Sequence, residues 1–142
     1  MPWFSKKKVL VPIDFSDHCF RALEAAREMV DRGSQLYAVH VLHEILVTEP
    51  GVIWNEIDDQ SRMRHVEEAI REKTSEPRYE GLNVAVLIGD RGQKIVDFAA
   101  ENGIELIVMP SHGRTGLKHL LIGSVAERVV RLAHCPVLVL RS

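Results

Sequence analysis

The glycine and serine residues between positions 110 and 124 are of the type, and at the spacing, found in anion-binding segments. This part of the chain reads PSHGRTGLKHLLIGS. Gly113 and Gly116 let the backbone turn tightly and approach a ligand closely, because no Cβ stands in the way. Gly123 and Ser124 open a helical pattern, and the first N–H groups of a helix have no partner inside it. Those groups and the helix dipole favour a phosphate, so we expect a phosphate site here, with the Ser124 hydroxyl as a further donor.

Arg114 and Lys118 would add positive charge to the same segment. The spacing excludes two common nucleotide loops, since the chain has no G-x-x-x-x-G-K-[ST] and no G-x-G-x-x-G after its first apolar run. On composition alone an ordinary connecting loop fits these residues as well as a phosphate site does.

The elements that must position this segment alternate between apolar runs and helical patterns. Such alternation predicts an α/β fold, with an open parallel sheet covered by helices on both faces. We expect Ser16 or Asp14 to cap the first helix, Gly33 and Gly103 to end the first and third, and Ser124 to cap the last. The predicted strands are residues 9–13, 36–42, 82–88, 104–109 and 137–140, and the predicted helices are residues 22–30, 56–73, 95–100 and 124–132.

In an open parallel sheet, ligands bind beyond the carboxyl ends of the strands, where the strand order reverses. Three segments should therefore converge: the end of the first strand at Asp14, the end of the second near Val41, and the end of the fourth at Met109.

Several side chains in these segments have more than one interpretation. Asp14 could be a metal ligand or a catalytic acid, but it lacks a carboxylate partner nearby in the sequence, so helix capping or ribose binding is favoured. His112 could be a general base, yet a hydrogen bond within its loop is the preferred interpretation. His40 lies among apolar residues and is expected to be packed. No H-x-x-x-H pair occurs, which disfavours zinc, and no residue is assigned a catalytic role.

Size and composition bound the class of protein. The chain has 142 residues, 46% of them hydrophobic and 27% charged, and a net charge of −2, which predicts one domain over residues 1–142. No basic field for nucleic acid and no apolar run of membrane length are present. Two cysteines, Cys19 and Cys135, make a disulfide framework improbable and favour the cytoplasm.

The last apolar run ends the sequence with no helix after it. At a sheet edge it would offer unpaired backbone groups. We expect a homodimer through this C-terminal strand, with a covered edge in a monomer as the alternative.

The segments KKKVLVPIDFS, YAVHVL, SHGRTGLKHLLIGSVAERVV and CPVLVLR resemble the universal stress protein family. The nucleotide motif of this family is G-x-x-G-x(9)-G-[ST], and Gly113, nine intervening residues and Gly123-Ser124 match its second half. Pro110 stands at the place of its first glycine. The resemblance implies an adenine nucleotide alpha hydrolase-like fold with strand order 3-2-1-4-5, in a protein that is often dimeric.

The resemblance also implies ATP, or AMP or ADP, as the ligand, with Mg²⁺ or Mn²⁺ held by its phosphates. Asp14 would accept hydrogen bonds from the ribose hydroxyls, and the backbone of Val41 would read the adenine edge. Pro110 has no N–H to donate, which would weaken or shift binding. The implied site comprises Pro12, Ile13, Asp14, Val41, Met109, Pro110, Gly113, Arg114, Gly123, Ser124 and Val125.

Three functions follow from these observations. The first is a nucleotide-binding stress-response or regulatory protein with little or no turnover, at most slow ATP hydrolysis. The second is a dimeric interaction module that binds no nucleotide, which Pro110 favours. The third is an enzyme acting on a second substrate, against which the short chain counts.

Overall fold

Five parallel strands form the centre of the protein in a computed structural model, which describes residues 6–43, 52–112 and 122–141, with the backbone alone for residues 52–58. The strand order is β3-β2-β1-β4-β5, and all four neighbouring pairs are parallel. The predicted order is thereby confirmed. The strands are β1 (Val9–Pro12), β2 (Leu36–Leu42), β3 (Asn83–Ile88), β4 (Leu106–Pro110) and β5 (Val137–Leu140).

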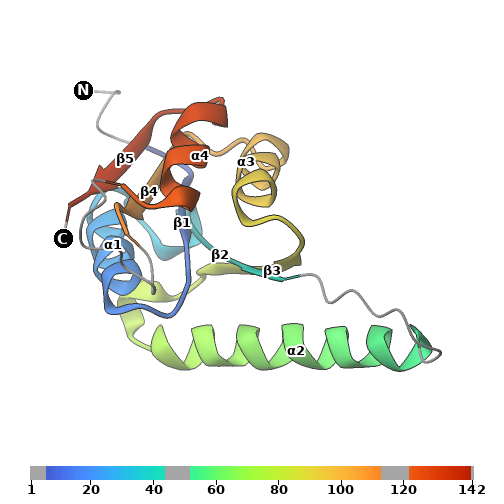
Figure 1. Cartoon of the computed structure of the whole chain (residues 1–142). Helices are drawn as coiled ribbons and strands as arrows, with labels where there is room; N and C mark the ends of the chain where they lie inside the picture. Colours follow the sequence, from blue (N-terminus) through green and yellow to red (C-terminus); the bar gives the residue numbers. More distant parts are fainter. Residues whose placement is uncertain (1–5, 44–51, 113–121, 142) are drawn as a thin grey trace.

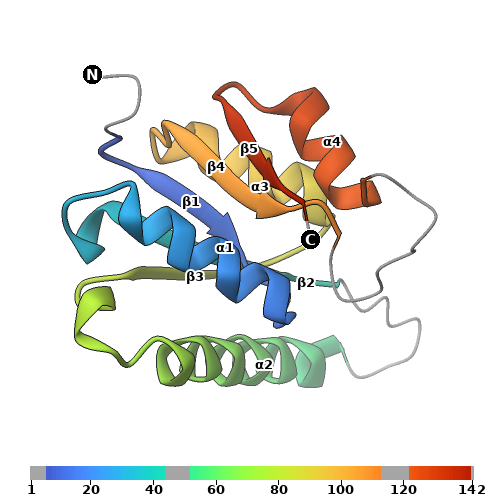
Figure 2. The same ribbon diagram turned by 90° about the vertical axis from the view of Figure 1, so that its left-hand side faces the viewer.

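Helices cover both faces of this sheet, as the alternating pattern predicts. In Figures 1 and 2, α1 and α2 lie on one face and α3 and α4 on the other. Successive side chains of a strand point to opposite faces, so Val9 and Val11 pack in one apolar cluster with α1, whereas Leu10 packs in the other with α3 and α4. The helices are α1 (Asp17–Glu28), α2 (Val52–Lys73), α3 (Arg91–Glu101) and α4 (Ser124–Leu132), and two short 3-10 turns span Gly33–Gln35 and Pro77–Tyr79.

Two expected helix caps are wrong. α1 ends at Glu28, and its C-cap is Met29, whose φ of −88° is right-handed, and not Gly33. Gly33 is buried, and a Cβ there would collide with the carbonyl oxygen of Glu80, so the glycine allows two turns to pack closely. At α4 the N-cap is Gly123, with no side-chain cap, and Ser124 is the first helical residue.

Other helix ends agree with the sequence. Ser16 caps α1 by accepting a hydrogen bond from the Cys19 amide. Gly103 follows α3 with a φ of +64°, a conformation that glycine adopts without steric cost. The amide of Ile104 then bonds back to the carbonyl of Ala99 (3.0 Å), so Ile104 belongs to the turn that follows α3 and not to the fourth strand as predicted, which begins at Leu106.

None of the helices in the described ranges has both the length and the apolar character that crossing a bilayer requires.

Candidate functional site

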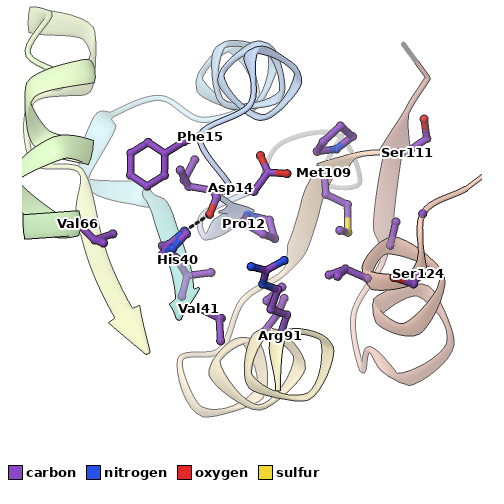
Figure 3. Close-up of a pocket in the computed structure, with 17 residues that line it drawn as sticks. Pro12, Asp14, Phe15, His40, Val41, Val66, Arg91, Met109, Ser111 and Ser124 are labelled. Atoms are coloured by element: carbon purple, nitrogen blue, oxygen red, sulfur yellow. Dashed lines mark hydrogen bonds between the residues drawn. The ribbon is translucent and has the colours of Figure 1, made fainter. Parts of the chain in front are cut away.

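A cavity of about 450 Å³ opens at the carboxyl ends of β1, β2 and β4, where the sheet rule places a ligand. Figure 3 shows its 17 lining residues. The structure brings together every predicted site residue that lies in the described ranges, and Gly113 and Arg114 lie outside them. The predicted residues in the wall are Pro12, Ile13, Asp14, Val41, Met109, Pro110, Gly123, Ser124 and Val125.

The turn after β1 is fixed by the Asp14 side chain. Its Oδ1 accepts hydrogen bonds from the Ser16 amide (3.0 Å) and the Ser16 hydroxyl (2.5 Å). Phe15 between them has a φ of +64°, which is unusual for a bulky residue and costs about 1–3 kcal/mol. The strained turn places the Phe15 ring in the cavity wall, edge-on to His40 with the ring centroids 5.3 Å apart.

His40 on β2 is packed as its apolar neighbours predict. Its Nδ1 lies 2.5 Å from the carbonyl oxygen of Ile13, which can only accept, so Nδ1 carries a proton. Burial lowers the pKa of His40, and the Arg91 charge lowers it further, while the bond to Ile13 and the charge of Asp14 oppose the shift. The net shift is downward, so His40 is neutral at pH 7 and forms an uncharged wall beside Phe15.

The backbone at the end of β4 has few free donors. Pro110 has no N–H, the Ser111 amide donates to Leu140 (2.8 Å), and the Gly123 amide donates to the Ser111 carbonyl (2.5 Å). Gly123 therefore uses its amide to hold the start of α4 against β4, and does not direct it at a ligand. The Ser111 hydroxyl lies 3.2 Å from Nδ1 of His112, which agrees with the loop hydrogen bond preferred for that histidine.

The start of α4 lines the cavity, and its first three amides have no partner among the described residues. Ser124, Val125 and Ala126 all line the cavity, and the first helical bond is made by the Glu127 amide to Gly123 (2.9 Å). Because the cap residue is a glycine, no cap side chain accepts from these three amides, and none of them bonds to another residue described in the structure. An anion in the cavity would meet three N–H groups and the positive end of the helix dipole.

Sequence reasoning missed Arg91, the first residue of α3. Its side chain reaches from below into the middle of the cavity, between Val41 and Met109 (Figure 3). Asp90 fixes this helix start by accepting a hydrogen bond from the Gln93 amide (3.0 Å). The sequence does place Arg91 directly after Gly89-Asp90, at the end of a predicted strand, and this position could have indicated that it lies near the site. Phe15 and Val66 in the wall were also missed, since their positions depend on the strained turn and on α2 packing.

The model of the universal stress protein family matches residues 6–141. The chain belongs to this family. Universal stress protein MJ0531 of Methanocaldococcus jannaschii is 34% identical over 142 residues, which cover 95% of this chain and 82% of that protein. The solved structure of MJ0577 from the same organism has a TM-score of 0.76 at 28% identity, over 96% of each chain.

A further universal stress protein has been solved in complex with cAMP. It superposes on this chain with a TM-score of 0.58 at 19% identity, over 96% of this chain and 97% of that one. A likeness at that identity establishes the shared fold alone.

Proposed function

We propose that this universal stress protein binds an adenine nucleotide, ATP or its products ADP and AMP, in the cavity at the strand ends and acts as a regulatory protein. The observation that carries the proposal is the start of α4, which has no side-chain cap and whose first three residues, Ser124, Val125 and Ala126, line the same cavity as Asp14.

The opposite end of the cavity suits a base. Val41, Val66 and Phe15 provide apolar and aromatic surface there, and His40 is held neutral by burial. Between the two ends lies Asp14, an acceptor suited to ribose hydroxyls. A volume of about 450 Å³ falls in the range of about 300–1,000 Å³ typical of small-ligand pockets.

We propose little or no turnover. Asp14 Oδ1 already accepts two hydrogen bonds from Ser16, which favours a structural role for that oxygen in the turn, and His40 packs edge-on against Phe15 in the cavity wall, so we assign neither residue a catalytic role. Within residues 6–43, 52–112 and 122–141, no three His, Cys, Asp or Glu side chains gather as metal ligands. A Mg²⁺ or Mn²⁺ ion would then be held mainly by the nucleotide phosphates.

A family member that binds no nucleotide is the alternative, and Pro110 favours it. Proline in the cavity wall removes one amide donor and adds bulk beside Ser111. The three α4 amides are unaffected by Pro110, which is why nucleotide binding is the stronger candidate.

A direct experiment separates the two. The purified protein is denatured, the supernatant is analysed for adenine nucleotide, and ATP, ADP and AMP are titrated into nucleotide-free protein by calorimetry with and without Mg²⁺. We expect released nucleotide or binding below millimolar concentration. No released nucleotide and no heat at millimolar ATP would support the alternative.

We further propose a homodimer through β5, in the cytoplasm, where the thiols of Cys19 and Cys135 stay free. The amide of Ile107 donates to the Pro136 carbonyl and that of Ser111 donates to the Leu140 carbonyl, so alternate residues of β5 direct their backbone N–H and C=O groups toward β4. Val137 and Val139 then present their N–H and C=O groups to the free edge. All four β5 residues are half-buried, and nearby Val130 on α4 is 48% exposed, which suits an apolar partner such as a second copy.

A further inference from the structure

Among the described residues, 17 line the cavity; Arg91 is the one arginine or lysine of these 17, and Asp14 is the one carboxylate. Arg91 is exposed at the first position of α3, and its side chain extends toward the space between the His40 wall and the start of α4 (Figure 3). A ligand that reaches from the aromatic wall to α4 must pass this guanidinium.

The position of Arg91 is held by the ends of two helices. Asp90 caps α3 through the Gln93 amide and forms an ion pair with Arg128 of α4 (3.3 Å). The Arg128 side chain runs over Gly92, where a Cβ would come within 2.8 Å of Arg128 Cδ. Gly92 thus allows the Arg128 side chain of α4 to lie close to the start of α3, and this contact and the ion pair hold the helix start that carries Arg91.

The charge of Arg91 acts within the cavity, since it contributes to lowering the pKa of His40 on the facing strand. The end of β4 offers little to compensate a ligand charge, because Pro110 has no amide hydrogen and the Ser111 and Gly123 amides are already bonded. The three α4 amides can meet the far phosphates, but the part of the ligand between them and the ribose needs another donor.

We propose that Arg91 binds the phosphate nearest the ribose, so that the site selects adenine nucleotides over adenosine whatever the length of the phosphate chain. This inference rests on the proposed nucleotide function. A guanidinium offers planar, paired donors that match phosphate oxygens. The first phosphate is common to AMP, ADP and ATP, so one residue would set their shared affinity while α4 sets the differences among them.

The test compares the unchanged protein with Arg91→Gln, Arg91→Lys and the control Lys94→Gln, which removes the same charge from the next turn of α3 outside the cavity. Calorimetry measures adenosine, AMP, ADP and ATP at one salt concentration. We expect Arg91→Gln to weaken all three nucleotides by a common factor of about tenfold and to leave adenosine unchanged. Arg91→Lys should lose less, and Lys94→Gln should lose nothing.

Several outcomes overturn the inference. If Arg91→Gln binds AMP with unchanged affinity, Arg91 does not contact the first phosphate. If adenosine loses as much affinity as the nucleotides, Arg91 has a structural role. If the loss grows from AMP to ATP, Arg91 contacts the far phosphates. If the unchanged protein binds no nucleotide, the proposed function fails and this inference fails with it. If it binds and Arg91→Gln binds equally well, the inference alone fails.

Discussion

Replacing Ser124 by aspartate should separate binding from stability at the start of α4. Ser124 is exposed, lines the cavity and occupies the first position of the helix. A carboxylate there interacts favourably with the helix dipole, so the free energy of unfolding should stay constant or rise by up to about 1 kcal/mol. The same carboxylate would stand where we propose that phosphates bind.

The loss of affinity can be estimated from the charges. Two like charges about 5 Å apart repel by about 1–2 kcal/mol at an effective dielectric constant of about 40–80. That energy weakens binding by about 5- to 30-fold for each phosphate charge that close. Because the repulsion depends on phosphate charge, ATP should lose more affinity than AMP.

The assay is calorimetry with ATP and AMP, accompanied by urea unfolding of each variant. Ser124→Asn is the matched control, since asparagine has nearly the same shape as aspartate but no charge. This variant should bind ATP almost as tightly as the unchanged protein does. An Ser124→Asp protein that is equally stable and binds ATP with unchanged affinity would refute the reasoning.

Three further predictions concern stability, pH and assembly. Gly33→Ala should lower the free energy of unfolding by about 3 kcal/mol, because its Cβ would meet the Glu80 carbonyl. Gly103→Ala should cost only about 1 kcal/mol, because its Cβ would make only an ordinary contact with Lys8 Nζ (3.8 Å) and the cost comes from the φ of +64°. Urea unfolding compares the two variants, and equal costs would contradict the packing account. Since burial lowers the pKa of His40 below its usual 6.5, the unfolded chain binds a proton there more readily than the folded protein, so the free energy of unfolding should fall as the pH drops below about 6.5. His40→Gln should reduce this pH dependence, measured by unfolding at pH 5.5 and 7.5. A variant with the same pH dependence would exclude His40 as its cause. Val139→Pro removes an N–H group from the free edge of β5 and should leave the hydrogen bonds to β4 intact. We therefore expect light scattering to show a monomer in place of a dimer. A variant that stays dimeric would exclude pairing through that edge.

Much of the fold follows from hydrophobic pattern, because strands buried on both faces read as continuous apolar runs. The same pattern located the site, since strand ends in a parallel sheet converge wherever the strand order reverses. Asp14, Val41 and Met109 were therefore found without any knowledge of their contacts, and the structure places them around one cavity.

The misses share a cause in contacts between distant segments. Gly33 reads as a helix end, but its small size serves packing against Glu80, 47 residues away. Arg91 becomes a cavity residue only because β3 lies beside β2, with the start of α3 next to His40. Gly123 reads as a ligand donor, yet its amide is taken by Ser111, a bond that no local pattern reveals.

The most direct test of the account is an ATP titration of ¹⁵N-labelled protein followed by amide resonances. Backbone N–H groups that bind phosphate should shift strongly, so the largest changes in the described ranges should fall on Ser124, Val125 and Ala126, with Gly103 at the opposite end of the sheet unchanged. Saturable ATP binding that leaves those three amides in place and moves resonances elsewhere would contradict the account.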